Sequence, residues 1–251
     1  MSDRAKIVWK SIGVSVVALI LIAAFVWGYL MSPTSEPCRA IHYTIADRSE
    51  RMYITEQEID ELLRSQDLYP VHRQQNMVSL YRIESAISHH PMVREAECYM
   101  NPRFEVQVYL TQRVPLLRVQ TPGDTYFIDE DRRVMPYRSA VKDRVLLVTG
   151  TVGTQMASSQ LADFAMWLRS DRYWRKRIYL LDVKSPNMVY LYLKDEAGKV
   201  QNERIVLGNM RGYEKKLAKL RTFQENSDPA IQDKHYSELD IRFEGQVIGR
   251  N

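Results

Sequence analysis

The stretch IESAISHHPMVREAECYMNPRFEVQVYLTQRVP, residues 83–115, decides the fold of the first folded region of the chain. Apolar residues recur at helical spacing up to Pro91, which predicts the helix end because the residue before a proline is pushed out of the α region. Residues 93–100 then predict a strand and residues 101–103 a turn. Residues 104–112 predict a second strand, since apolar and polar side chains alternate along them.

Three more elements complete this first domain on the N-terminal side. Residues 39–46 predict a strand with its apolar side chains on one face. Thr55-x-x-Glu58 is a capping box, in which a hydroxyl and a carboxylate satisfy the first amides of a short helix. A second helix is predicted over about residues 79–89. The order β-α-α-β-β predicts a compact α+β domain whose helices cover one face of a sheet.

The second region of the chain is predicted to be mostly β. Ser158–Ser159 can cap a helix that carries Phe164 and Leu168 on its inner face, and residues 212–223 predict another helix. The residues predicted to form strands are 116–119, 126–128, 134–135, 145–148, 178–183, 188–193 and 204–207.

The chain closes on SELDIRFEGQVIGRN, residues 237–251. Leu239, Ile241 and Phe243 alternate there with charged residues, which is the period-two pattern of a half-buried strand. A terminal strand with nothing after it leaves one edge of a sheet open, and open edges are a hazard that proteins usually manage. The pattern therefore raises the question of what covers this edge.

The N-terminal segment predicts a membrane anchor. Residues 12–31 contain no charge and would span about 30 Å as a helix, the thickness of the hydrocarbon core of a bilayer. Three basic residues against one acid in residues 1–11 predict a cytoplasmic tail. A cleaved signal peptide is the alternative, but its apolar region is usually shorter and no A-x-A-like cleavage site is evident. Everything after residue 32 is therefore expected outside the cytoplasm.

The composition allows a packed core and gives little reason to expect a nucleic acid as partner. Hydrophobic residues make up 45% of the chain, and the net charge of +4 comes from basic side chains interleaved with acidic ones. The two cysteines, Cys38 and Cys98, are too few for a disulfide framework. One lies beside the predicted span and the other in a predicted strand, so free thiols are expected.

A search for catalytic or metal-binding motifs is mostly negative. The five histidines match no zinc spacing, and G-x-S-x-G is absent. Residues 150–154, GTVGT, lack the Lys-Ser/Thr that grips phosphate, so a turn at a strand exit is expected. The three acids at 129–131 are expected in a solvated turn. The basic run RYWRKR, residues 172–177, is expected to form a surface between a helix end and a strand, with lipid contact or partner docking as the alternative. The sequence predicts no enzyme, no cofactor and no metal site.

The order of these parts resembles the FtsQ/DivIB family of cell-division proteins. Each matching stretch is short, and their order along nearly the whole chain carries the resemblance. Arg133 departs from the family pattern, because it stands where a glycine is usual in the hairpin of the second domain. The stretches similar to family segments are residues 83–100, 106–119, 127–136, 205–220 and 236–251.

The resemblance implies a division of the chain into five parts. These are a cytoplasmic tail at 1–11, a transmembrane helix at 12–31, a spacer at 32–38, a POTRA domain at 39–114 and a β domain at 115–251. It implies a non-enzymatic scaffold of the divisome at the septum, held in the lipid of the cell inner membrane by its single span, with both outer domains in the periplasm. The partners that it implies are FtsB- and FtsL-like division proteins, recruited by β-augmentation at the C-terminal strand.

By motif match, the resemblance implies a set of partner-binding residues at the C-terminus. Arg242 is expected to pair with an acidic partner segment, Phe243 to act as an aromatic anchor, and Gly245 to allow close approach of the partner backbone. Leu239 and Ile241 are expected to face the core, whereas Phe243 could face either way. The implied partner-binding residues are Tyr236, Arg242, Phe243, Gly245, Gln246 and Val247.

Two alternatives from other classes of protein remain. One is a POTRA-containing component of protein export or outer-membrane assembly, which predicts repeated POTRA units or a barrel. The other is a membrane-tethered periplasmic hydrolase, which predicts a pocket with a nucleophile and base or a metal cluster. Depletion separates them, because filamentous cells indicate a division protein and loss of outer-membrane proteins indicates export.

Overall fold

The structure is a computed structural model that describes residues 19–27, 36–46, 53–139, 141, 145–195, 197–226 and 236–250. The predicted tail at 1–11 lies outside these residues, and so does much of the predicted span at 12–31. Residues 19–27 are helical and exposed. Within the described ranges, no helix combines the length and the apolar character that crossing a bilayer requires.

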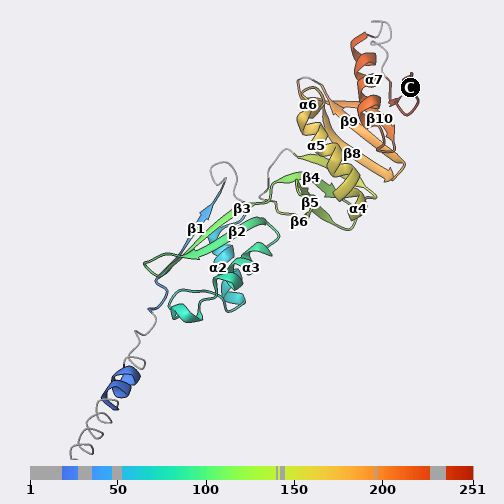
Figure 1. Ribbon diagram of the computed structural model, residues 1–251. Coiled ribbons are helices and arrows are strands. Elements are labelled where there is room, and N and C mark those ends of the chain that lie inside the picture. The colour runs from blue at the N-terminus through green and yellow to red at the C-terminus, as the bar shows by residue number, and fades with distance from the viewer. Residues whose placement is uncertain are drawn as a thin grey trace, which may run out of the picture.

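The first domain has the predicted β-α-α-β-β order, with one additional 3-10 turn. Its three strands form a sheet in the order β1-β3-β2, in which β3 pairs in parallel with β1 and antiparallel with β2. Both helices lie on one face of this sheet (Figure 1). The elements are β1 (Ala40–Ile45), α2 (Glu56–Ser65), η1 (Gln75–Met77), α3 (Leu80–Ser88), β2 (Val93–Met100) and β3 (Glu105–Gln112).

Local capping explains where the two helices begin. The predicted capping box of α2 is confirmed, because the Glu58 amide donates to the Thr55 hydroxyl at 3.2 Å and the Thr55 amide donates to the Glu58 carboxylate at 2.9 Å. Ser79 caps α3 by accepting from the Arg82 amide. The helices and the sheet share one hydrophobic cluster. Its members include Ile59, Leu63, Ile83 and Ile87 from the helices and Val106 and Val108 from β3.

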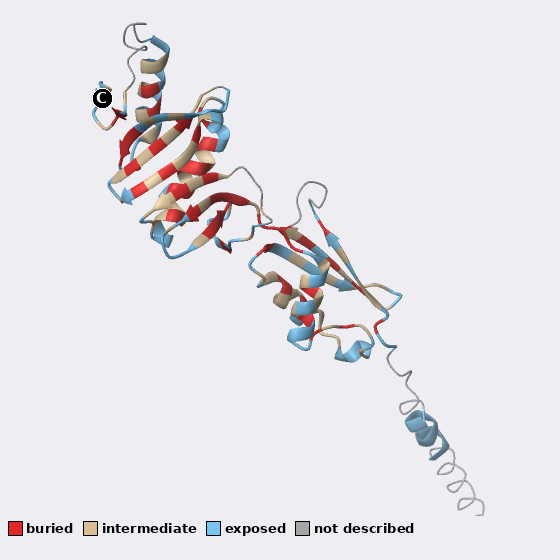
Figure 2. Ribbon diagram, turned by 180° about the vertical axis from the view of Figure 1, so that it is seen from behind, coloured by how far each residue is buried: buried red, intermediate tan, exposed pale blue. Residues whose placement is uncertain are grey.

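The second domain is built on one mixed sheet of nine strands in the order β12-β11-β10-β9-β8-β7-β4-β5-β6. Figure 2 shows buried and less buried residues alternating along several of its strands. Its strands are β4 (Pro115–Gln120), β5 (Thr125–Asp129), β6 (Val134–Pro136), β7 (Leu146–Gly150), β8 (Ile178–Ser185), β9 (Met188–Lys194), β10 (Val200–Gly208), β11 (Glu238–Asp240) and β12 (Ile248–Arg250). Its helical elements are α4 (Thr154–Met156), η2 (Ala157–Leu161), α5 (Ala162–Ser170), α6 (Trp174–Arg177) and α7 (Tyr213–Asn226).

Helices α5 and α7 pack on the same side of this sheet. Phe164 of α5 and Tyr213 of α7 make an edge-to-face contact with ring centroids 5.0 Å apart. Leu217 and Leu220 of α7 are fully buried in the same cluster as the inner face of the sheet. The residues at 178–183, 188–193 and 204–207 that were predicted to be strands all lie within β8, β9 and β10.

The start of the helical segment before α5 differs from the prediction. Helix α4 begins at Thr154, so Ser158 and Ser159 lie inside the helical segment rather than at its cap. Their hydroxyls donate backwards, to the carbonyls of Thr154 at 3.0 Å and Gln155 at 2.6 Å. Serine can satisfy its hydroxyl in this way within a helix, which is why a serine pair alone did not mark the helix start.

The two domains share a buried junction. Phe127 of β5 and Met135 of β6 belong to the hydrophobic core of the first domain. Arg113, which directly follows β3, donates to Asp129 at 2.7 Å, and both side chains are almost completely buried. The prediction that the acids at 129–131 lie in a solvated turn is therefore wrong for Asp129, because Arg113 holds it inside the junction.

The closing stretch also differs from the prediction of one strand. Residues 237–251 contain two short strands, β11 and β12, joined by a turn, and the two pair antiparallel as a hairpin. Strand β11 pairs in parallel with β10 on its other side. The chain does not continue as one strand because it turns at Gly245. Gly245 has a φ of +74°, a backbone conformation that residues with a side chain rarely adopt.

A candidate partner-binding edge at the C-terminus

The large sheet ends on β6 on the side of the first domain and on β12 at its other edge. Strand β11 is covered on both sides, by β10 and by β12. Strand β12 pairs with β11, and within the described residues no strand pairs with its other side. The open edge expected from the sequence therefore exists, but it lies on the last strand of the hairpin and not on the stretch that begins at Leu239.

The loop between β11 and β12 is attached to helix α7. Lys219 of α7 donates to the carbonyl of Ile241 at 3.0 Å and also to the carbonyl of Phe243. The Ile241 amide in turn donates to Val206 of β10 at 3.1 Å. These contacts fix the loop at both its start and its middle, so the hairpin that presents β12 is supported from the body of the domain.

A network of ion pairs lies under the hairpin. Arg204 and Arg250 both contact Glu238, at 2.7 and 3.0 Å, and Arg242 contacts Asp240 at 2.6 Å. Burial by itself would raise the pKa of Asp240, but hydrogen bonds from Arg242 and the charges of Arg242 and Arg250 outweigh it and lower that pKa. The hydrogen bond to Asp240 is also the main reason why the pKa of Arg242 is raised.

The surface that this network presents is cationic. The two carboxylate side chains, Glu238 and Asp240, are 7% and 0% exposed, whereas those of Arg204, Arg242 and Arg250 are 50%, 33% and 58% exposed. A partner that approaches the hairpin therefore meets guanidinium groups, which bind carboxylates in a planar, two-pronged geometry.

Two glycines allow side chains to lie directly on the backbone here. A Cβ atom at Gly249 of β12 would lie 2.3 Å from the Tyr236 ring, so the ring packs onto the edge strand where only glycine leaves room. A Cβ atom at Gly208 would lie 2.8 Å from the Arg242 side chain, and Gly208 has a φ of +75°. Tyr236 and Arg242 can pack closely against the backbone because Gly249 and Gly208 have no side chains.

Four of the residues implied by the resemblance lie around this hairpin in distinct settings. Tyr236 is half-buried against Gly249, and Arg242 is paired with Asp240. Phe243 is 44% exposed, with the Arg242 guanidinium 5.5 Å from its ring centre. Gly245 occupies the turn, with open space where a Cβ would be.

The other two implied residues are not placed as expected. Gln246 and Val247 were implied as part of the C-terminal partner-binding strand, but they lie in the loop before β12. Val247 packs partly against the core of the domain. The expectation that Leu239 and Ile241 face the core is confirmed, since they are 2% and 0% exposed.

Sequence reasoning missed the acids of this site. The alternation predicts Glu238 and Asp240 on the polar face of a strand, but both are buried beneath Arg204, Arg242 and Arg250. The available signal was the turn. Gly245 lies between a short alternating stretch, Leu239–Ile241, and the apolar pair Val247–Ile248, and a glycine between two such stretches is typical of a hairpin.

The other candidates for chemistry lie apart from this hairpin. Among the described residues, no group of His, Cys, Asp and Glu side chains could hold a metal ion. Cys38 and Cys98 are free, as expected, and burial raises the pKa of both thiols. The basic run at 172–177 includes helix α6, where Trp174 is buried and Arg177 lies over the ring of Tyr173.

The chain thus consists of a small α+β domain followed by a domain built on a nine-stranded mixed sheet. A model described as POTRA-like domain matches residues 36–111, and a model described as FtsQ/DivIB, C-terminal related matches residues 114–250. Since the second match covers more than half of the chain, the chain belongs to the FtsQ/DivIB family. No curated protein matched the chain.

The family membership gives the general role. FtsQ/DivIB is a family of non-enzymatic, membrane-associated scaffolds of cell division, and the two matched domains indicate a scaffold role in division for this chain. They also indicate that its partners are division proteins.

Proposed function

We propose that this chain is a single-span divisome scaffold of the inner membrane that recruits FtsB- and FtsL-like proteins by β-augmentation on strand β12. The proposed layout is a cytoplasmic tail at 1–11, a span at 12–31, a spacer at 32–38, a POTRA domain at 39–114 and a β domain at 115–251. The observation that carries the proposal is the open side of β12 at the end of a nine-stranded sheet.

The chemistry of the hairpin favours an acidic, extended partner segment. Backbone groups of β12 would supply the hydrogen bonds of an added strand, and these carry affinity without sequence specificity. Specificity would come from Arg242 and Arg250, which would pair with partner carboxylates, and from the exposed ring of Phe243 as an anchor. Gly245 would leave space for the partner backbone beside the loop. Tyr236 and Val247 pack against the core of the domain and would hold the hairpin in position. Gln246 is exposed in the loop next to β12, where a partner could contact it.

Two variants test the edge directly in a pull-down of FtsB- and FtsL-like proteins by the full-length chain. Ending the chain after Val247 removes β12, and we expect it to abolish capture, because the strand that pairs with the partner is gone. Phe243→Ala should weaken capture by about 30-fold, since losing an aromatic anchor costs about 2 kcal/mol. For both variants the partner is titrated, and the partner concentration that gives half-maximal capture is compared with that of the wild type.

The matched control is Tyr81→Ala, which removes an aromatic ring of similar size that is 78% exposed on α3 of the other domain. We expect it to leave capture unchanged. Thermal melting of each variant shows whether the outer domains remain folded. Full capture by the chain that ends after Val247, in a folded protein, would show that the partner binds elsewhere.

The proposed topology has its own test. A reporter that is active only outside the cytoplasm, fused after Asn251, should be active, because the basic residues before the proposed span favour a cytoplasmic N-terminus. A reporter that is active only in the cytoplasm, fused at the same position, should be silent. Activity of the second reporter would place the docking edge on the wrong side of the membrane for this proposal.

A further inference from the structure

On the side away from its helices, the sheet of the first domain carries residues that are exposed in the part of the chain that the structure describes. Two rows of facing residues cross it. One row is Thr44 on β1, Tyr109 on β3 and Glu97 on β2, and the next row pairs Thr111 on β3 with Glu95 on β2. Alternation explains the arrangement, since the intervening residues of β3 are buried against the helices.

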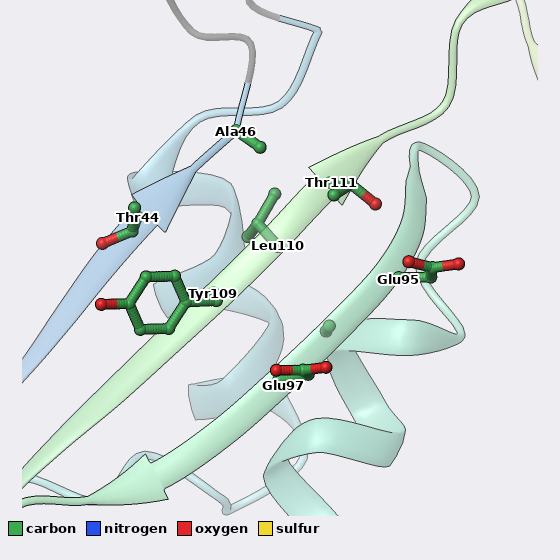
Figure 3. A pocket seen from close by; sticks show the side chains of 8 residues that line it. Thr44, Ala46, Glu95, Glu97, Tyr109, Leu110 and Thr111 are labelled. Carbon is green, nitrogen blue, oxygen red and sulfur yellow. The ribbon is translucent and has the colours of Figure 1, made fainter.

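This face is hollowed at one end. A cavity of about 230 Å³ lies where β1 ends and β2 begins. Figure 3 shows Tyr109 beside Thr44 on one side of this region, and Glu95 and Glu97 on the neighbouring strand. The residues of its lining that matter for binding are Thr44, Ala46, Glu95, Glu97, Tyr109 and Thr111.

Three of the polar side chains around the hollow have no partner among the residues that the structure describes. Neither Glu95 nor Glu97 forms an ion pair within the part of the chain that the structure describes. The Thr111 hydroxyl oxygen is buried, and among the described residues it has no hydrogen-bond partner. A buried hydroxyl without a partner is costly, so a ligand that supplies a donor would be favoured there.

The charged side chains on this face are mainly acidic, although His42 lies 3.7 Å from Glu105, and Arg94, which pairs with Asp131, directly precedes Glu95. The outward residues of β1, β2 and β3 include Glu95, Glu97 and Glu105, and from Ala40 to Ala46, Glu95 to Met100 and Glu105 to Gln112 there is no lysine or arginine. Tyr109 stacks with Tyr99 at a centroid distance of 5.9 Å, and both rings are nearly half exposed. The face therefore combines carboxylates with aromatic rings, which is the surface that a cation prefers.

We infer that this hollow receives a lysine or arginine side chain from an extended basic segment of another protein. The partner cation would pair with Glu95 and Glu97, contact the ring of Tyr109 and offer a donor to the Thr111 hydroxyl. An anionic lipid surface or an acidic peptide would be repelled. The inference goes beyond the proposed C-terminal function, because that edge is cationic and selects partners of the opposite charge.

A labelled peptide gives the direct test with the full chain in detergent. The probe is a heptapeptide with arginine at alternating positions, and its matched control carries citrulline, which keeps the shape and removes the charge. Fluorescence anisotropy should show binding of the arginine peptide and little or none of the citrulline peptide. Binding should weaken as salt rises, because exposed charge pairs are screened.

Protein variants locate the binding. Glu95→Gln/Glu97→Gln should weaken the arginine peptide at least tenfold, and Tyr109→Ala should weaken it more than Tyr109→Phe does. The control Glu61→Gln/Glu225→Gln removes the same charge from two other exposed positions and should leave binding unchanged. Equal binding of both peptides, or an equal loss in the control, would overturn the inference.

Crosslinking in cells tests the identity of the occupant. A photoreactive residue in place of Thr44, at the rim of the hollow, should crosslink a segment of another protein that carries lysine or arginine, and Glu95→Gln/Glu97→Gln should remove that crosslink. A crosslink to a second copy of this chain, or to an acidic segment, would overturn the inference. The C-terminal variants of the proposed function should not affect this crosslink, so the two proposals can fail separately.

Discussion

Asp129→Ala is expected to lower the free energy of unfolding by about 3–5 kcal/mol, the largest stability loss that we predict for this chain. The change leaves the guanidinium of Arg113 buried at the domain junction without its partner at 2.7 Å. Asp131 lies 3.8 Å away and is more exposed, so it compensates only in part. Thermal melting of the outer domains should show a drop of roughly 10 °C for a protein of this size.

The matched control is Arg94→Ala, which breaks an ion pair across the same junction between two partly exposed side chains. It should cost about 1 kcal/mol or less, because exposed pairs contribute little. The double variant Arg113→Met/Asp129→Leu should recover much of the loss, since it removes both buried charges. A melting temperature of Asp129→Ala within 2 °C of the wild type would contradict the assigned role.

Asp240→Ala is expected to cost about 2 kcal/mol and to reduce partner capture as well. It removes a carboxylate that is completely buried and leaves Arg242 without its charge-assisted hydrogen bonds. Since Arg242 lies over Gly208 and next to Phe243, we expect the hairpin to lose its fixed position. Denaturant unfolding measures the first effect and the partner titration measures the second. A control, Glu225→Ala on exposed α7, should change neither.

The contribution of Asp240 also has a predicted pH dependence. Its pKa is lower in the folded protein than the usual value of 3.8, so the folded state favours the ionised form. The stabilisation is therefore fully present above the unfolded pKa and is lost as pH falls through the folded pKa. The difference in stability between the wild type and Asp240→Ala should stay constant from pH 7 to about pH 5 and shrink below about pH 4. A difference that stays constant down to pH 2 would contradict this.

The elements of the fold were predictable where short-range chemistry decides them. The capping box at Thr55 and the helix stop before Pro91 need only neighbouring residues, and α2 and α3 lie where those signals predicted them. The setting of Asp129 depends on Arg113, sixteen positions earlier in the chain. No periodicity in the sequence reports such a contact, so a buried acid was indistinguishable from a solvated one.

The candidate site was predictable in its location but not in its construction. The alternation at Leu239 and Ile241 correctly gave the inner face of a strand. The prediction of a single strand was wrong beyond this point. The alternation continues to Phe243, but β11 ends at Asp240 and the backbone turns at Gly245. The free edge therefore moved to β12, whose three residues are too few to show a period of their own.

The order of strands in the large sheet sets the distance between the first domain and the edge strand β12. Strand β6 lies at the end next to the first domain and β12 at the far end, eight strand spacings away (Figure 1). At about 4.8 Å per spacing, the two ends are separated by roughly 38 Å. Under the proposed anchoring, a partner held in the same membrane must reach past the whole first domain before it meets β12. Shortening the segment of such a partner between its anchor and its docking strand should abolish capture without altering a single contact residue.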